Sequence, residues 1–459
     1  MERKNVWSSY TPEEKKELNE LNNNYISFLN TGKTERECVK ESIRLAEAHG
    51  YVDIETIRQQ NKKLQPGDRV YAVNMKKSIA LFQIGTGKME DGLLILGAHI
   101  DSPRLDIKQN PLYEDTDFAY LDTHYYGGIK KYQWVTLPLA IHGVVSKKDG
   151  SLVEITIGEA EDDPVFCVTD LLIHLAAEQQ KKAGSKVVEG EQLDLLFGSM
   201  PLAGEEKDAV KANVLSLLKE KYDLTEEDFY SAELEIVPAG RAREAGIDRS
   251  MILSYGQDDR VCAYTSLAAM FDPAVQEKTL CCLLVDKEEI GSVGATGMQS
   301  KFFENTVAEL MELTEGFQEL SLRRCLSHSR MLSSDVSAAY DPLYASAFEK
   351  RNAAYFGRGI VFNKFTGRGG KSGSNDANAE YLGALRKIMD DNHVAWQTAE
   401  LGKVDIGGGG TIAYILSLYG MEVVDSGVAV LSMHAPYEVT SKADVYEAYK
   451  CYKAFLKDA

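Results

Sequence analysis

The sequence predicts an α/β fold, in which a mostly parallel sheet is flanked by helices and one β-rich segment is inserted. Three observations support this fold class. After Met251 the chain alternates between strand and helix patterns, which is typical of parallel sheets covered by helices. The run Gly92–Ala98 is apolar on both faces, as in a central covered strand. Between Asp106 and Ile247 short alternating runs are separated by acidic, Gly- and Pro-bearing turns, which indicates a separate unit.

The length of 459 residues exceeds the size at which one hydrophobic core usually stops growing, so two domains are expected. We predict a discontinuous domain formed by residues 1–105 and 248–459, and an inserted domain formed by residues 106–247. The hydrophobic fraction of 44% and the charged fraction of 26% are those of an ordinary globular protein. A net charge of -19 argues against a nucleic-acid partner, because phosphate binding needs clustered Lys and Arg.

No apolar run approaches the roughly 20 residues that a membrane span requires, so we expect no membrane partner and a cytoplasmic protein. Seven cysteines form no C-x-x-C pair, which fits reduced thiols better than disulfides. Cys281 and Cys282 lie inside a buried-looking strand and are interpreted as core residues.

The first elements are marked by local signals. Thr11 with Glu14, and Thr34 with Glu37, form capping boxes that predict two helices, the second ending near His49. A hairpin-like pair of strands follows a Pro-Gly turn, at residues 69–73 and 79–84, before the apolar run already described.

The second half supplies the remaining elements. Strands are predicted at Met251–Tyr255, Leu280–Val285, Gly359–Phe365 and Val423–Ser432. Helices are predicted at Arg260–Phe271, Phe302–Leu313, Asn375–Asp391 and Ser441–Leu456. In the insertion, Leu152–Ile157 and Leu234–Val237 are predicted strands, and helical spacing marks residues 205–222.

The strand Leu280–Val285 leads into two adjacent carboxylates, Glu288 and Glu289, before a Gly-Ser turn. Taken alone, this pattern is typical of a solvated acidic loop. Because side chains alternate along extended backbone, the two carboxylates are expected to point in different directions, one to a metal and one to a water.

Further polar side chains stand at the ends of other predicted strands. His99 and Asp101 lie on the same side of an extended chain, so the carboxylate could orient the imidazole, although a core histidine has the same pattern. Asp258 and Asp259 open a helix, where one carboxylate could act as an N-cap and the other is then left for a different role.

Asp335 follows a short predicted strand and His434 follows the strand at 423–432. With the preceding sites they give a set of nitrogen and oxygen donors that suits zinc or manganese in a catalytic site. Five protein ligands exceed what one catalytic zinc takes, so a bridging carboxylate and two metals about 3.5 to 4 Å apart are expected. The remaining glutamate could serve as general base.

These motifs, in order and spacing, resemble the aspartyl aminopeptidase and aminopeptidase I family of two-zinc exopeptidases over nearly the whole chain. The resemblance implies a zinc-exopeptidase-like fold with an inserted β-rich dimerisation domain. It also implies that dimers assemble into a tetrahedral dodecamer. Its implied site residues are His99 and Asp335 on one zinc, Glu289 and His434 on the other, Asp258 as the bridge, Glu288 as general base, and Asp101 as the residue that orients His99.

One departure from the family concerns the neighbouring subunit. Family members from animals contribute a histidine from the inserted domain, in a segment resembling residues 168–175, where this chain has Asp170 with His174 one helical turn later. Either His174 substitutes or the role is filled differently. His124 and His142, also in the insertion, are interpreted as surface or core residues.

Two glycine-rich segments also invite a functional interpretation. Gly367–Ser372 resembles the end of a phosphate-binding loop, but the pattern requires a glycine where Phe365 stands, so nucleotide binding is not predicted. Asp405–Thr411 precedes a helix and could offer N–H groups to a substrate, or could form a tight turn that permits close packing.

The leading hypothesis is a metallo-aminopeptidase that removes N-terminal residues from peptides. Two alternatives stay open: a metal-dependent carboxypeptidase or N-acyl amino acid hydrolase, and a non-catalytic scaffold of the same fold. Manganese or cobalt could replace zinc at such a ligand set. A preference for acidic or for neutral N-terminal residues is left open, with Lys364, Arg368 and Lys371 as candidate contacts for an acidic residue.

Overall fold

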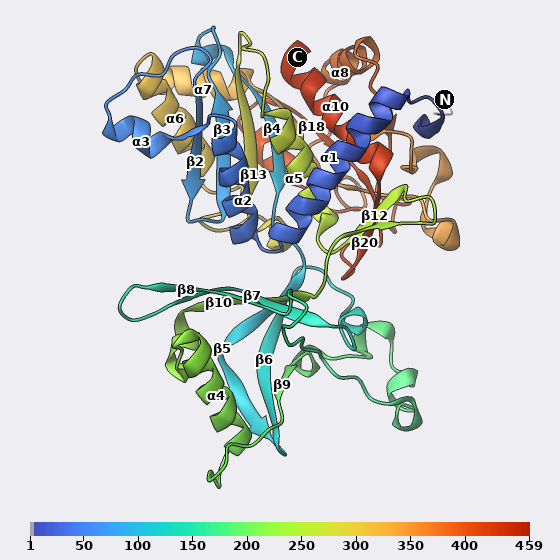
Figure 1. Ribbon diagram of the computed structural model, residues 1–459. Coiled ribbons are helices and arrows are strands. Elements are labelled where there is room, and N and C mark those ends of the chain that lie inside the picture. The colour runs from blue at the N-terminus through green and yellow to red at the C-terminus, as the bar shows by residue number, and fades with distance from the viewer. Residues whose placement is uncertain (1–3) are drawn as a thin grey trace. The chain divides into compact units, whose positions relative to one another are not determined.

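The computed structural model describes residues 4–459 (Figure 1). Contacts divide the chain into two compact units. The first comprises Met1–Asp101, Ala242–Met433 and Glu438–Ala459, and the second comprises Ser102–Arg241 and His434–Tyr437. The second unit thus begins at 102 and ends at 241, where the sequence predicted an insertion from 106 to 247; that it folds independently stays a prediction.

The predicted N-terminal helices are confirmed. Helix α1 (Pro12–Thr31) and helix α2 (Glu35–Ala48) each begin with the full capping box, in which the N-cap threonine and the glutamate three residues later exchange side-chain and backbone hydrogen bonds. A short helix α3 (Ile54–Gln59) follows, with Asp53 as its N-cap.

A nine-stranded sheet forms the centre of the first unit, with strand order β1-β2-β3-β13-β4-β14-β18-β16-β17. Its strands are β1 (Val52–Asp53), β2 (Arg69–Asn74), β3 (Ser78–Gln83), β4 (Leu93–His99), β13 (Thr279–Val285), β14 (Arg330–Ser333), β16 (Ile360–Asn363), β17 (Trp396–Thr398) and β18 (Glu422–Gly427). The four strands from β13 to β18 run parallel, while β2, β3 and β13 pair antiparallel, as do β18 and β16. The sheet is therefore mixed, with a parallel centre.

Helices cover both faces of this sheet and enclose two cores. One core joins α1, α2 and the helices α5 (Gln257–Ala269), α8 (Ala379–Asp391) and α10 (Lys442–Asp458). The other joins α3 and the helices α6 (Phe302–Thr314), α7 (Glu319–His328) and α9 (Ala413–Ser417). Adjacent residues of β13 alternate between them: Cys282 packs in the first core and Cys281 in the second, as expected for core cysteines in a covered strand.

One predicted strand and part of another belong to a different sheet. Strand β12 (Met251–Ser254) pairs in a five-stranded sheet with β11 (Arg243–Ala245), β15 (Ser337–Ala338), β19 (Ala429–Leu431) and β20 (Glu438–Ser441). The predicted strand at 423–432 is wrong as one element, because β18 ends at Gly427 and β19 enters this second sheet. A Cβ at Gly427 would lie 1.8 Å from the carbonyl oxygen of Asp335, so only glycine allows the backbone to pass there.

The second unit is built on a six-stranded antiparallel sheet, with strand order β8-β7-β10-β5-β6-β9. Its strands are β5 (Arg104–Asp115), β6 (Phe118–Tyr126), β7 (Leu139–Ser146), β8 (Leu152–Ile157), β9 (Leu195–Gly198) and β10 (Ala232–Pro238). Helix α4 (Ala209–Tyr222) confirms the helical spacing predicted in this stretch. Short 3-10 turns occupy much of the chain between Ile173 and Gln192.

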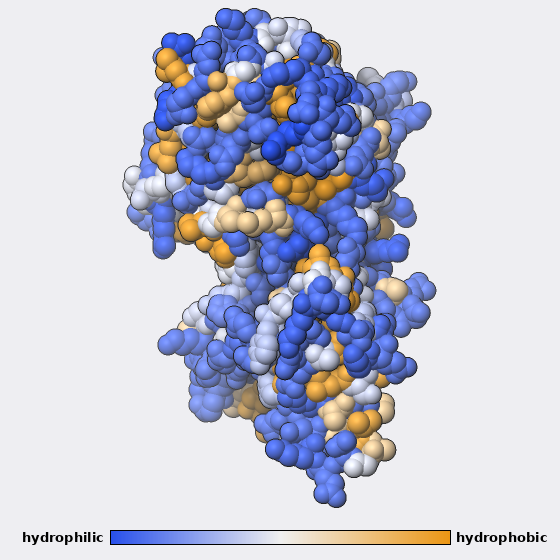
Figure 2. All heavy atoms as spheres, turned by 90° about the vertical axis from the view of Figure 1, so that its left-hand side faces the viewer, coloured by the Kyte–Doolittle hydropathy of each residue, from blue (hydrophilic) through white to orange (hydrophobic). Residues whose placement is uncertain are grey.

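The surface and the thiols agree with the composition. Figure 2 shows one face on which hydrophilic residues predominate and apolar residues form several separate patches. In the described residues, no helix combines the length and apolar character needed to cross a membrane. All seven cysteines are free, and only Cys167 is not buried.

Candidate active site

His99 is the last residue of β4, at the carboxyl end of the central strands, and is 1% exposed. Its ring nitrogen Nδ1 lies 3.0 Å from the backbone carbonyl of Asp101 and 3.3 Å from the carboxylate of the same residue. These contacts indicate that Nδ1 carries a proton and donates it in a hydrogen bond to Asp101. Nε2 then faces the neighbouring acidic side chains. A histidine held in this way presents Nε2 as a metal ligand.

The Asp101 carboxylate has a second set of contacts that the sequence did not suggest. It accepts hydrogen bonds from the backbone N–H groups of Glu288 at 3.1 Å and Glu289 at 3.2 Å. Asp101 therefore connects the end of β4 to the turn after β13, in addition to contacting His99.

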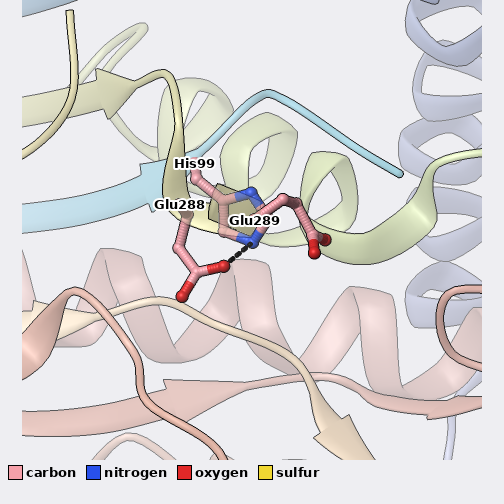
Figure 3. A group of neighbouring side chains, drawn as sticks. All are labelled: His99, Glu288 and Glu289. Atoms are coloured by element: carbon pink, nitrogen blue, oxygen red, sulfur yellow. Dashed lines mark ion pairs between the residues drawn. The ribbon is translucent and has the colours of Figure 1, made fainter. Parts of the chain in front are cut away.

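Glu288 and Glu289 lie on a 3-10 turn, η9 (Glu288–Ile290), that begins after Lys287 adopts a left-handed backbone conformation. Figure 3 shows the Glu288 carboxylate turned towards the His99 ring, with 3.9 Å to Nε2, and the Glu289 carboxylate pointing in another direction. The predicted divergence is present, but its predicted cause is wrong: the tight turn, and not strand alternation, separates the two side chains.

Asp258 comes four residues after β12, at the start of α5, and its Oδ1 lies 3.2 Å from Nε2 of His99. Asp258 and Asp259 both have non-helical φ and ψ angles, so the regular part of α5 begins after them. The Asp259 carboxylate accepts the backbone N–H of His99 at 3.3 Å.

Asp335 follows β14, the strand next to β4, and its Oδ1 lies 4.0 Å from Nε2 of His99. Donor atoms of His99, Asp258 and Asp335 all lie within 4.8 Å of one another, as do donor atoms of His99, Glu288 and Glu289. A carboxylate oxygen of Asp258 is also within 4.8 Å of one from Glu289. The structure thus brings all the predicted site residues of the first unit together.

The electrostatics of this cluster favour a bound cation. Burial raises the pKa of Asp335 well above its usual range, and the negative charges of Asp259 and Glu288 raise it further. Burial alone would lower the pKa of His99, but its hydrogen bonds to Asp101 and Asp258 outweigh that effect and hold this pKa well above its ordinary value. A divalent cation would relieve the repulsion among these carboxylates, so the residues present fit a metal site.

His434 belongs to the short segment that groups with the second unit, and its Nδ1 lies 2.9 Å from the carbonyl oxygen of Gly128 in that unit. One further residue near the cluster, Glu438, was not singled out from the sequence. It opens β20 and accepts the backbone N–H of Asp258. Glu438 stands between apolar residues and belongs to no recognisable motif. Only the pairing of distant strands shows that it lies near the cluster.

The histidines and the aspartate considered in the second unit have local contacts. His174 is exposed on a 3-10 turn, and Asp170, also exposed, accepts hydrogen bonds from the Leu171 N–H and from the Gln179 side chain. His142 is buried and pairs with Glu159 at 3.1 Å, whereas His124 is exposed.

The glycine-rich segments are also accounted for. A Cβ at Gly407 would lie 1.7 Å from the carbonyl oxygen of Leu401, which matches the tight-packing interpretation of this segment. Of the basic residues on the neighbouring loop, Lys371 pairs with Asp376 at 3.2 Å, while Lys364 and Arg368 are exposed.

Comparison with known proteins identifies the family of this chain. Residues 28–456 match the family model described as aminopeptidase I zinc metalloprotease (M18). A probable M18 family aminopeptidase 1 from Clostridium acetobutylicum is 61% identical over 100% of this chain and 98% of its own length. The corresponding relative from Thermotoga maritima is 45% identical over 100% of this chain and 99% of its own length.

Solved structures give the same result. The crystal structure of an M18-family aminopeptidase from Thermotoga maritima superposes with a TM-score of 0.95 at 45% identity, and each chain is covered completely. The crystal structure of aminopeptidase I from Clostridium acetobutylicum superposes with a TM-score of 0.93 at 60% identity, covering 100% of this chain and 99% of the other. These relatives favour an aminopeptidase over the carboxypeptidase, N-acyl hydrolase and scaffold alternatives. The chain belongs to the M18 family of zinc metallo-aminopeptidases.

Proposed function

We propose that the protein removes N-terminal residues from peptides at a site that holds two zinc ions. His99 and Asp335 would hold one ion, Glu289 and His434 the other, and Asp258 would contact both. The observation that carries this proposal is the position of Asp258, whose carboxylate lies within 4.8 Å of donor atoms from His99 and Asp335 and also from Glu289. One carboxylate with donors on both sides is the arrangement that a bridging ligand requires.

Metal ions at this site would lower the pKa of a bound water and polarise the peptide carbonyl. Glu288 is proposed as the general base that takes the proton from that water. Its side chain is 17% exposed, against 1% for His99, so solvent and substrate can reach it. Asp101 holds the Glu288 N–H and the His99 ring at once, and thereby fixes the base relative to the ligand.

Zinc content and substrate chemistry test this proposal together. Metal analysis of the purified protein should give about two zinc ions per chain, and a peptide with a free N-terminus should be cleaved while its N-acetylated form is not. Preference for the acetylated peptide would overturn the aminopeptidase mechanism. One zinc ion per chain with full activity would overturn the two-metal site, and manganese or cobalt in place of zinc would identify the native metal.

The substrate preference is a separate question that a panel of N-terminal residues answers. Lys364, Arg368 and Lys371 are all exposed. Lys371 also pairs with Asp376 and lies over the Phe365 ring at 3.9 Å. If an acidic N-terminal residue is preferred, Lys364→Ala or Arg368→Ala should reduce cleavage of an acidic substrate and leave a neutral substrate unaffected. Equal loss on both substrates would exclude these residues as the source of specificity.

Self-association through the second unit, with dimers assembling into a dodecamer, is part of the same proposal. A structure of a Saccharomyces cerevisiae protein, titled as the mApe1 dodecamer, shares the fold with a TM-score of 0.76 at 18% identity. In this chain Leu172, Ile173 and Leu175 are 56%, 63% and 66% exposed, which is unusual for adjacent apolar side chains. Light scattering should give the mass of twelve chains, and a monomer at micromolar concentration would contradict the assembly.

A cytoplasmic location is proposed from the thiols. All seven cysteines are free and six of them are buried, which fits a reducing compartment. Cell fractionation of the native host would test it, and recovery of the protein outside the cytoplasm would contradict it.

A further inference from the structure

The backbone of Asp258 cannot be held by its own helix. Although Asp258 stands at the start of α5, its φ of -80° and ψ of 108° are not helical. Its N–H is buried and needs an acceptor elsewhere in the protein. That acceptor is Oε2 of Glu438, at 2.9 Å. Glu438 is 1% exposed and is separated from Asp258 by 180 residues of sequence.

The preceding residue, Gln257, is attached to the same strand. Its amide Nε2 donates to the backbone carbonyl of Glu438 at 2.7 Å, and its Oε1 accepts from the Thr440 hydroxyl at 2.6 Å. Strand β20 also pairs antiparallel with β12, which leads into this turn, with Ser254 opposite Glu438. Strand β12, before the turn, and Gln257, after it, are therefore both attached to β20.

A carboxylate is an expensive acceptor at this position. One backbone N–H could be satisfied by a neutral group, and a buried negative charge close to other carboxylates is unfavourable. A charged acceptor makes a shorter and stronger hydrogen bond, and carboxylates just outside a metal site commonly orient its ligands. A buried Glu438 is therefore expected where the position of Asp258 must be held by a strong hydrogen bond.

The placement of Asp258 matters because its carboxylate is common to both groups of donors. Oδ1 lies 3.2 Å from Nε2 of His99, and a carboxylate oxygen lies within 4.8 Å of Glu289. A backbone shift of a few tenths of an ångström would change both sets of distances at once. We infer that Glu438 is a positioning residue, which fixes the Asp258 backbone and thereby sets the affinity of the site for its metal pair. This inference rests on the proposed two-metal site.

The test compares Glu438→Met, which fills a similar volume without an acceptor, with Glu438→Gln, which keeps an oxygen for the Asp258 N–H. Zinc affinity is measured by competition with a chromophoric chelator, and ligand geometry by the visible absorption of the Co²⁺-substituted protein. Glu438→Met should weaken zinc binding about 10- to 100-fold, shift the Co²⁺ spectrum and reduce kcat more than it changes KM. Glu438→Gln should restore most of the affinity and the spectrum.

Asp444 offers a matched control. It is also a buried carboxylate, and it accepts the backbone N–H groups of Gly357 and Gly359, both at 2.8 Å. Asp444→Asn should lower the thermal stability of the protein and leave zinc affinity and the Co²⁺ spectrum unchanged. If Glu438→Met does not fold, Glu438→Asp replaces it, because a side chain shorter by one methylene withdraws the acceptor and should weaken zinc binding about tenfold.

Zinc affinity and a Co²⁺ spectrum equal to those of the unmodified protein, in a folded Glu438→Met or Glu438→Asp variant, would overturn the positioning role. Asp258→Asn separates that result from a failure of the proposed function. If Asp258→Asn loses zinc while the Glu438 variants do not, only the positioning role is wrong. If Asp258→Asn keeps two zinc ions at full affinity, the proposed assignment of Asp258 as the bridging ligand is wrong.

Discussion

The strand-end part and the turn part of the candidate site are held in different ways. His99 is the last residue of β4 and Asp335 follows β14, and these two strands are adjacent at the parallel centre of the large sheet. Their side chains are 1% and 10% exposed. Glu288 and Glu289 instead occupy a 3-10 turn, and the Glu288 side chain is 17% exposed. The strand-end part takes its rigidity from the packed core on both faces of the sheet, whereas Asp101 supplies hydrogen bonds that hold the turn part.

This difference corresponds to a difference in chemistry. Metal ligands must be dehydrated and must keep fixed distances, which burial at strand ends provides. A general base must reach a water and a substrate and must exchange its proton, which suits an accessible side chain on a turn. Substitution of the proposed base, Glu288, should therefore reduce turnover. Substitution of a proposed ligand, at a strand end or at Glu289 on the turn, should instead reduce zinc affinity.

The largest effect is expected at the turn. Glu288→Gln removes the proposed base but keeps the size of the side chain, so kcat should fall by roughly 10³-fold while about two zinc ions per chain are retained. Kinetics with a free-amine peptide and metal analysis of the same sample measure both quantities. The adjacent variant Glu289→Gln is the control and should lose zinc. Turnover above about a tenth of the original in Glu288→Gln would show that another group is the base.

A strand-end substitution should reverse the pattern. Asp335→Asn removes a charged donor from the buried group, so zinc affinity should fall by at least about 100-fold, which is the upper range for losing a group just outside a metal site. Excess zinc should restore part of the activity. Asp341→Asn is the control, since Asp341 caps a surface turn nearby and should leave zinc binding intact. Unchanged zinc affinity in Asp335→Asn would remove this residue from the ligand set.

Asp101 connects the two parts, so its substitution should affect both measurements. Asp101→Asn keeps one acceptor oxygen but cannot accept from both Glu288 and Glu289 and also face His99. We expect zinc affinity and kcat each to fall by about tenfold, at the lower end of the range for such outer groups. A change confined to one of the two measurements would show that Asp101 serves only one part of the site.

The sequence predicted the strand-end part well because its signals are local. An apolar run of strand length precedes His99, and a short predicted strand precedes Asp335, so both residues were expected at the carboxyl ends of covered strands. Parallel neighbours bring such ends to one edge of the sheet, so these residues could be grouped from the order of the strands and helices alone. The capping boxes of α1 and α2 are local signals of the same kind.

The parts that sequence could not predict depend on distant pairings. The run at 423–432 is mostly apolar, yet the chain leaves one sheet at Gly427 and joins another. An apolar pattern does not record which sheet a strand joins. The 3-10 turn at Glu288 begins after Lys287, which has a left-handed backbone conformation. A lysine in the sequence does not predict that conformation. Glu438 acquires its role from pairing between β12 and β20, which no local pattern contains.

The smallest predicted effect concerns stability beneath the strand-end part. Asp425, on β18, pairs with Ser333, two residues before Asp335, and burial raises the pKa of its carboxyl from 3.8 to about 7. Between about pH 4 and pH 7 the unfolded chain has lost this proton and the folded chain keeps it. The contribution of Asp425 to the free energy of unfolding is therefore complete below about pH 4. It decreases by about 1.4 kcal/mol per pH unit as the pH rises to about 7.

Asparagine at this position carries no titrating proton. Urea unfolding of the metal-free protein and of Asp425→Asn, at pH 5 and at pH 7, isolates the effect. The free energy of unfolding of the unmodified protein, relative to the variant, should be about 2 kcal/mol higher at pH 5 than at pH 7. Because the comparison is made without metal and within one pair of proteins, titration of the other carboxylates cancels. An equal difference at both pH values would show that Asp425 is already ionised at pH 5 in the folded protein. A buried negative charge would then lie beneath the strand-end part.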